Sequence, residues 1–225
     1  MPAPRLARLS GAAFTRVALG CLWLVAWLPW SWQRGLAAAF GAFAFHVVRI
    51  RRHVVLVNLR VCFPELTESA RHTLARRHFQ SLALGILEVA RCWWRHPAAL
   101  PPSRIEGVEA LEKALATGRG VLLVSGHFTT LEIAGRMLAL RTRICCLYRD
   151  PNNPVLADLL RKHRTAWANR AIEMRDMSGL MRALRDGEAV WYAPDQGKWT
   201  PQSAVLPFFG RPAITNLSTS RLAKM

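Results

Sequence analysis

The sequence predicts an α/β fold, with a mostly parallel sheet flanked by helices and an N-terminal helical segment associated with a membrane. The first observation is the alternation of short apolar runs with helical patterns beyond residue 101. Strands are expected near 120–126, 143–148 and 189–193, and helices near 130–140, 153–164 and 177–186. The second observation is a long uncharged run near the N-terminus. Residues 101–225 are therefore predicted to form an α/β catalytic domain.

The uncharged run covers residues 17–33, between Arg16 and Arg34, and contains four tryptophans, Trp23, Trp27, Trp30 and Trp32. A helix of this length reaches ~25 Å, enough to cross a thin bilayer, with tryptophans suited to its interface. Residues 1–33 are predicted to be a single-pass membrane anchor. Basic residues on both sides leave its orientation open. A cleaved signal peptide is disfavoured, because no clear small-residue cleavage site follows the run. A buried or interfacial helix of a soluble protein is a further alternative, because Pro29 interrupts the run.

Residues 34–100 are predicted to be helical and close to the membrane. Within them, residues 35–60 begin with an uncharged half and then mix valines and leucines with a basic cluster of Arg49, Arg51, Arg52, His53 and Arg60. This pattern is typical of an amphipathic helix on an anionic membrane, although an ordinary solvated helix face has the same pattern. Pro64 ends that helix, Thr67 is suited to cap a long helix over about 68–95, and prolines from 97 to 102 mark a linker.

The composition narrows the class of protein. The 225 residues carry 31 Lys+Arg against 14 Asp+Glu, a net charge of +17, so the surface is expected to bind nucleic acid, acidic lipid or acidic protein. An apolar content of 52%, nine tryptophans and the lack of a nucleic-acid-binding signature favour a membrane surface. The five cysteines form no C-x-x-C pair and are odd in number. They are predicted to be free thiols in a reducing compartment, and no metal site is expected.

The residues most suggestive of chemistry lie in the segment 120–132, where an apolar strand leads through Gly126 and His127 into a helix that contains Glu132. The His-x-x-x-x-Glu spacing arises readily by chance. On one continuous helix the two side chains would point ~140° apart, so a working pair needs His127 on the turn and Glu132 inside the helix. Glu132 can then accept a hydrogen bond from one imidazole nitrogen and leave the other basic. This predicts His127 as a general base toward a hydroxyl, the alternative being a structural histidine and a solvated glutamate.

Further polar residues follow two of the predicted strands at the same edge of the sheet, and Arg175 precedes the helix expected near 177–186. Those predicted to bind substrate are Arg149, Asn152, Asn153, Arg175 and Asp195. Each taken alone is also explained as a turn residue or a surface charge. There is no Gly-x-Ser-x-Gly motif and no cysteine beside His127 in the sequence. Direct attack by an acceptor hydroxyl is therefore favoured over a covalent acyl-enzyme.

Several blocks together resemble the bacterial lipid A biosynthesis acyltransferases, the lauroyl and myristoyl enzymes within the wider lysophospholipid acyltransferase group. The matching blocks are residues 52–65, 126–132, 148–154, 187–196, 207–210 and 219–225. The resemblance implies transfer of a fatty acyl group from acyl carrier protein to a hydroxyl of a Kdo-bearing lipid A precursor. It places the enzyme at the cytoplasmic side of the inner membrane. His127 and Glu132 match the family's catalytic dyad, and no cofactor is implied beyond the acyl donor. The expected partners are acyl carrier protein, the lipid A precursor and anionic inner-membrane lipids, without nucleic acid.

Two departures from the family pattern leave alternatives open. Where the family usually has Asp-Gln-Asp, this chain has Asp195, Gln196 and Gly197, followed by Lys198. The chain also stops at Met225 inside an expected helix, so the C-terminal part of the domain is expected to be missing, either from a fragment or from a shortened member. The alternatives are an acyltransferase for another glycolipid or a lysophospholipid, and a catalytically silent membrane-bound binding or scaffold protein.

Overall fold

The computed structural model describes residues 5–197, 199–201 and 203–224, with side chains from residue 11 onward. Lys198, part of the departure from the family pattern, lies outside these residues. The chain divides into two compact units. The sheet unit contains the residues up to Trp27 together with Ala90–Ser125 and Leu131–Ala193, and the helical unit contains Leu28–Val89, Gly126–Thr130 and Pro194–Met225. The chain thus passes repeatedly from one unit to the other. The domain borders expected after residues 33 and 100 stay predictions.

The sheet unit is built on four parallel strands in the order β1 (Val121–Val124), β4 (Ala189–Tyr192), β2 (Ile144–Tyr148) and β3 (Arg170–Glu173). The predicted α/β class with a mostly parallel sheet is confirmed, and three strands lie where the sequence placed them. Strand β3 was not predicted, because its four residues include only two apolar side chains between an arginine and a glutamate. The central strands β2 and β4 are the most buried, as expected for a sheet covered on both faces.

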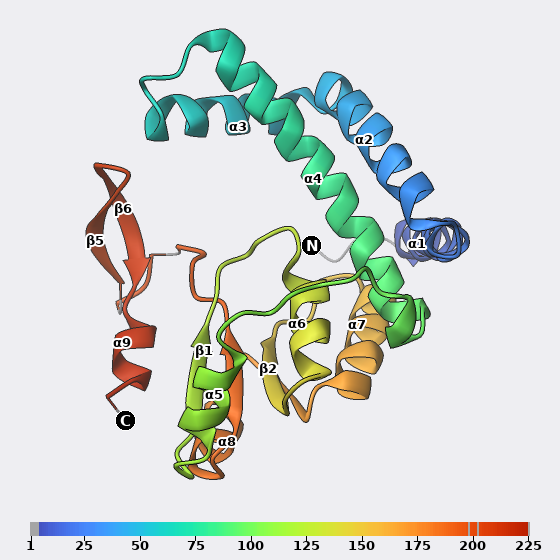
Figure 1. The fold of residues 1–225 in the computed structure, drawn as a ribbon. Helices are drawn as coiled ribbons and strands as arrows, with labels where there is room; N and C mark the ends of the chain where they lie inside the picture. Colours follow the sequence, from blue (N-terminus) through green and yellow to red (C-terminus); the bar gives the residue numbers. More distant parts are fainter. Residues whose placement is uncertain (1–4, 198, 202, 225) are drawn as a thin grey trace. The chain divides into compact units, whose positions relative to one another are not determined.

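Helices α6 (Leu131–Ala139), α7 (Pro154–Trp167) and α8 (Met177–Arg185) connect these strands, close to the predicted ranges. Right-handed crossovers in this strand order put α6 and α7 on one face of the sheet and α8 on the other (Figure 1). Asn153 caps α7 and Asp176 caps α8 through their side-chain oxygens. Helix α5 (Val108–Leu115) packs on β1 and follows the short 3₁₀ helix η1 (Pro97–Ala99).

The thiols of β2 are part of the core of the sheet unit. Cys145 and Cys146 are buried, and all five cysteines are free, as predicted. Burial raises the pKa of Cys145 to about 12 and the pKa of Cys146 to about 11. The Cys145 thiol also donates a hydrogen bond to Glu188 Oε2 over 3.1 Å. Both thiols are therefore protonated and unreactive in the folded protein.

The prediction of one helix over residues 17–33 is wrong. Helix α1 (Arg5–Ala26) ends before Pro29, and α2 (Trp30–Val47) begins after it, since Pro29 has extended backbone and acts as the N-cap residue of α2. Helix α1 belongs to the sheet unit, where Thr15 Oγ1 accepts a hydrogen bond from Asn153 Nδ2 over 2.8 Å. Within the described part of the chain, every helix is too short or too polar to span a bilayer.

The helical unit is formed by α2, α3 (Arg49–Cys62) and most of α4 (Glu68–Trp94). Its core contains Phe45 of α2 and Ala75 and Phe79 of α4, with Val55, Leu56 and Leu59 of α3 packed against them. The helix expected over residues 35–60 is divided at Val48, while the long helix expected over 68–95 is confirmed. The predicted cap of that helix is confirmed as well, because Thr67 Oγ1 accepts a hydrogen bond from the Ala70 backbone over 3.2 Å.

The helical unit also contains an antiparallel hairpin of β5 (Ser203–Phe208) and β6 (Arg211–Asn216), followed by α9 (Ser218–Leu222). Its two-residue turn consists of Phe209 and Gly210, with φ angles of 51° and 68°. Positive φ at both turn residues matches the right-handed twist of hairpin strands. The hairpin was not predicted as secondary structure, although residues 207–210 are one of the blocks that resemble the family.

Candidate functional site

His127 and Asp195 meet because β1 and β4 are neighbouring parallel strands. The segments that leave their carboxyl ends continue alongside each other, and the Ser125 backbone N–H donates to the Tyr192 carbonyl over 2.8 Å. Two residues later the His127 backbone N–H donates to Asp195 Oδ2 over 2.8 Å, and the imidazole Nδ1 lies 2.5 Å from Asp195 Oδ1. The Asp195 carboxylate thus binds both the backbone and the ring of His127.

This geometry fixes the tautomer of the neutral imidazole. An ionised carboxylate only accepts hydrogen bonds, so the ring proton lies on Nδ1 and Nε2 of the neutral ring is unprotonated. Burial alone raises the pKa of Asp195, but the hydrogen bonds from the His127 backbone and ring outweigh it, and the pKa lies below its ordinary value. The side chains are 40% and 46% exposed, so a substrate can reach the ring. The arrangement is suited to proton transfer from a hydroxyl.

Glu132 has a different partner within the sheet unit. Arg164 of α7 donates to Glu132 Oε2 from Nη2 over 2.7 Å and from Nε over 3.3 Å. Burial alone lowers the pKa of Arg164, but the charge and hydrogen bond of Glu132 outweigh it and raise that pKa. Glu132 Oε1 is also buried and has no hydrogen-bond partner in the structure. A buried carboxylate with one unpaired oxygen can accept a hydrogen bond from a bound molecule.

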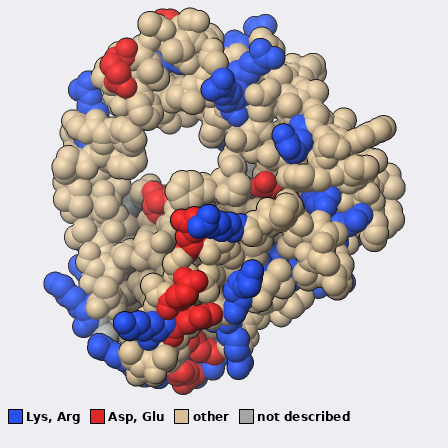
Figure 2. Space-filling model, in the orientation of Figure 1, with Lys and Arg blue, Asp and Glu red and all other residues tan. Residues whose placement is uncertain are grey.

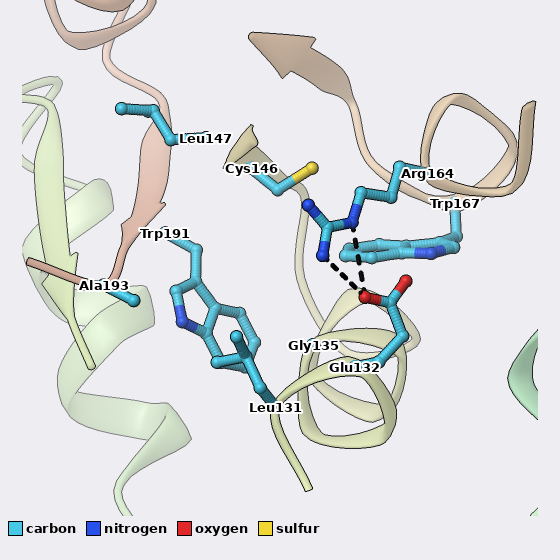
Figure 3. Close-up of a pocket in the computed structure, with 9 residues that line it drawn as sticks. All are labelled: Leu131, Glu132, Gly135, Cys146, Leu147, Arg164, Trp167, Trp191 and Ala193. Atoms are coloured by element: carbon cyan, nitrogen blue, oxygen red, sulfur yellow. Dashed lines mark hydrogen bonds and ion pairs between the residues drawn. The ribbon is translucent and has the colours of Figure 1, made fainter. Parts of the chain in front are cut away.

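The ion pair forms one wall of a small hollow in the sheet unit. Figure 3 shows Trp191 of β4 across this hollow from the ion pair, with Trp167 of α7 beside the ion pair. The lining residues are Leu131, Glu132, Gly135, Cys146, Leu147, Arg164, Trp167, Trp191 and Ala193. A Cβ atom at Gly135 would lie 3.0 Å from Trp191 Cζ3 and 3.2 Å from Trp167 Cη2. A glycine at this position therefore keeps the space between the two rings open.

The structure brings two of the predicted residues into contact, because Asp195 binds the imidazole of His127. The predicted hydrogen bond from the imidazole to Glu132 stays a prediction, since the two residues belong to different units. Asn153 uses its side-chain oxygen to cap α7. Arg149, Asn152 and Arg175 are exposed on segments that follow β2 and β3. Their roles in substrate binding stay predictions.

Three residues of the hollow, Arg164, Trp167 and Trp191, were not predicted from the sequence. One signal for Arg164 was present. Glu132 is flanked by Leu131 and Ile133 at the start of an amphipathic helix, and a carboxylate on the buried side of a helix requires a cationic partner. The signal does not identify which arginine is the partner, because Arg164 lies 32 residues further along the chain.

Comparisons with known proteins identify the family of the chain. Residues 5–225 match the model of the family described as bacterial lipid A biosynthesis acyltransferase. A lipid A biosynthesis lauroyltransferase from Escherichia coli strain K12 is 32% identical over 213 residues, which cover 94% of this chain and 70% of that protein. A palmitoleoyltransferase from the same strain is 32% identical, covering 90% of this chain and 65% of that protein, and a myristoyltransferase is 23% identical.

The chain spans roughly two thirds of the length of these relatives, 70% of the first and 65% of the second. The family match covers nearly all of the chain, including both members of the His127–Asp195 pair and the hollow beside Glu132. The chain therefore belongs to the bacterial lipid A biosynthesis acyltransferase family.

Proposed function

We propose that this protein transfers a fatty acyl group from the thioester of acyl carrier protein to a hydroxyl of a Kdo-bearing lipid A precursor. The observation that carries the proposal is the hydrogen bond between His127 Nδ1 and Asp195, which leaves Nε2 as a base. The names of the relatives, which transfer lauroyl, palmitoleoyl and myristoyl groups in lipid A biosynthesis, support the same reaction.

In the proposed reaction, His127 Nε2 removes the proton of the acceptor hydroxyl as its oxygen attacks the thioester carbonyl carbon. The new C–O ester bond forms, the C–S bond breaks, and the imidazolium returns its proton to the leaving thiolate. Asp195 holds the ring and stabilises its charged form during the step. A positioned base of this kind contributes typically ~10² to 10⁴ in rate. The reaction requires no cofactor beyond the acyl donor.

Glu132 is proposed to hold the substrate, because Asp195 already orients the imidazole. Its Oε2 is occupied by Arg164, and its buried Oε1 is available to a hydrogen-bond donor of a molecule in the hollow. The apolar rings of Trp167 and Trp191 are suited to the hydrocarbon part of such a molecule. The family resemblance, which matches both His127 and Glu132 to the catalytic dyad, supports a shared role in turnover.

We propose that the enzyme acts at the cytoplasmic side of the bacterial inner membrane, where a lipid acceptor would be available. The net charge of +17 favours binding of a phosphorylated lipid and of an acidic carrier protein. Nucleic acid is not a proposed partner, since the charge is accompanied by a strongly apolar composition.

The proposal is tested with His127→Ala and Glu132→Ala in the full-length protein, expressed in a strain without its own late lipid A acyltransferase. In cells that express either variant, the extracted lipid A is expected to lack the added acyl group, which mass spectrometry measures. His78→Ala, an exposed histidine on α4, is the matched control and retains the added mass. If cells with the His127 variant made lipid A of the same mass as cells with the unmodified protein, the proposal would be contradicted.

Gly197 supports a second candidate function, in which the acceptor is another glycolipid or a lysophospholipid. A Cβ atom at Gly197 would lie 2.4 Å from the Ile214 carbonyl oxygen of β6, so an aspartate does not fit there without a backbone shift. The carboxylate usual in the family would therefore require the backbone to move at this position. Purified protein assayed against a panel of acceptors separates the two classes by the acceptor that is acylated fastest.

A further inference from the structure

Helix α2 exposes a stripe of large apolar side chains to solvent. The stripe consists of the exposed side chains of Trp32, Leu36, Phe40, Phe43 and Val47. Their spacing of three and four residues places them along one side of the helix. The adjacent side, with Ala37, Gly41 and Phe45, is buried within the helical unit. The stripe is therefore additional to the apolar side chains that the core requires.

Helix α3 has a second stripe, and basic residues border it on both sides. Ile50, Val54 and Val61 are 81%, 45% and 43% exposed, while Val55, Leu56 and Leu59 pack inward against the core. At 100° per residue, Arg49 lies along one edge of the exposed stripe and Arg51 along the other. Arg60 lies on the same edge as Arg49, but its guanidinium pairs with Glu68 of α4. An apolar stripe with a cation on each edge is the arrangement of helices that lie in a membrane interface.

The charge distribution along the chain points to the same kind of partner. The first acidic residue of the sequence is Glu65, so α2 and α3 contain arginines and no carboxylate. Acidic side chains are instead prominent beside basic ones over the part of the surface that contains α5 and α8 (Figure 2). Pairing with the same face of a second copy would bring like charges together. An anionic lipid surface supplies both the negative charge and the apolar layer.

We propose that the outer face of α2 and α3, defined by the two exposed stripes and by Arg49 and Arg51, docks on an anionic lipid bilayer. The apolar stripes enter the boundary between headgroups and acyl chains, and the arginines bind lipid phosphates. The helices lie along the surface, in contrast to the bilayer crossing first expected for residues 17–33. The inference deepens the proposed function by naming the surface that meets the membrane, but its test uses no turnover.

Vesicle co-sedimentation of the 225-residue protein tests the docking surface. Vesicles of phosphatidylcholine alone are compared with vesicles that contain one quarter phosphatidylglycerol, at low and high salt. Tighter binding to the anionic vesicles is expected, and it weakens as salt increases. Arg51→Gln should weaken binding to anionic vesicles about five-fold, the equivalent of ~1 kcal/mol for one arginine near the surface. The double variant Phe40→Ser/Phe43→Ser should weaken binding to both vesicle types.

Two matched controls lie in the sheet unit and should leave binding unchanged. Arg119→Gln removes an exposed arginine, and Leu140→Ser removes an apolar side chain that is 54% exposed. Circular dichroism verifies that each variant retains its helix content. Equal binding of all variants would overturn the proposal. It would also be overturned if the stripe variants changed the oligomeric state without changing vesicle binding, since a second copy would then cover the face. Acyl transfer in detergent micelles reports separately on the proposed reaction.

Discussion

Asp195 acts on the imidazole through two hydrogen bonds that an amide does not reproduce. In Asp195→Asn, one carboxylate oxygen becomes an NH₂ donor, so the side chain loses either the backbone bond or the ring bond. An amide that donates to Nδ1 moves the ring proton to Nε2 and removes the base. The variant is expected to lose ~10² to 10⁴ in kcat with little change in KM. Steady-state kinetics with acyl carrier protein as donor measure both constants.

The control for Asp195 is Asp158→Asn, an exposed carboxylate on α7 that is 80% exposed and pairs only loosely with Arg161. Its kcat is expected to equal that of the unmodified protein. If Asp195→Asn raised KM and left kcat unchanged, Asp195 would bind substrate and would not orient His127.

Arg164 compensates a carboxylate that is only 8% exposed. Arg164→Met leaves Glu132 buried without a cation, and removing one partner of a buried pair costs about 3–5 kcal/mol. Adding Glu132→Gln to this variant is expected to restore part of the lost free energy of unfolding, because no charge is then left buried. Denaturant unfolding of the two single variants and the double variant measures the coupling. Strictly additive effects would show that the contact is energetically unimportant.

At the scale of elements, the packing of α2 on α4 depends on Gly41. A Cβ atom there would lie 2.4 Å from Gln80 Cα, so Gly41→Ala forces the two backbones apart. We expect a loss of about 1–3 kcal/mol in the free energy of unfolding. Gly35→Ala on the same helix is the matched control, since no atom lies within 4 Å of its Cβ position. That control should gain up to about 1 kcal/mol from helix propensity. Thermal unfolding of both variants distinguishes crowding from propensity.

Helix α4 contains a carboxyl group whose environment opposes its charge. Burial raises the pKa of Glu88, and its Oε2 atom has no hydrogen-bond partner in the structure. A raised pKa in the folded state stabilises the fold below the unfolded pKa of about 4.3, and this contribution is lost as pH rises through the folded value. Glu88→Gln is therefore expected to stabilise the protein at pH 7, by on the order of 1 kcal/mol, and to have a smaller effect at pH 4.

Urea unfolding at the two pH values tests the expectation for Glu88. The comparison variant is Glu68→Gln on the same helix, whose pKa is lowered mainly by its hydrogen bond with Arg60. Its substitution should have the opposite sign, with a loss at pH 7 that shrinks toward pH 4. A Glu88 effect independent of pH would mean that the carboxyl group is solvated.

At the scale of the whole molecule, the sequence predicted what depends on short-range pattern. The strands β1, β2 and β4 and the helices α4, α6, α7 and α8 follow from apolar periodicity and capping residues. The partner of His127 did not follow, because the contact with Asp195 depends on β1 lying beside β4, 68 residues further along the chain. The sequence predicted one helix over residues 17–33, whereas the structure divides them between α1 and α2. Hydrophobicity favoured one long helix, and the backbone restriction of Pro29 prevailed.

Each of the two compact units is assembled from separate stretches of the chain. The chain passes from one unit to the other after Trp27, Val89, Ser125, Thr130 and Ala193. Contacts such as Thr15 with Asn153 join residues 138 positions apart within one unit. A linear reading detects changes in composition along the chain, but it does not detect returns of the chain to an earlier unit.

The buried thiols of β2 allow the opening of the sheet to be measured by chemical labelling. Cys145 and Cys146 are protonated and enclosed in the folded sheet, whereas Cys21 is exposed. A pulse of maleimide at neutral pH should therefore modify Cys21 at once and modify Cys145 and Cys146 only when the sheet opens. Mass spectrometry of peptides after timed pulses would then give the opening rate of the sheet in an unmodified chain. Simultaneous labelling of all three cysteines would show that β2 is already open in solution.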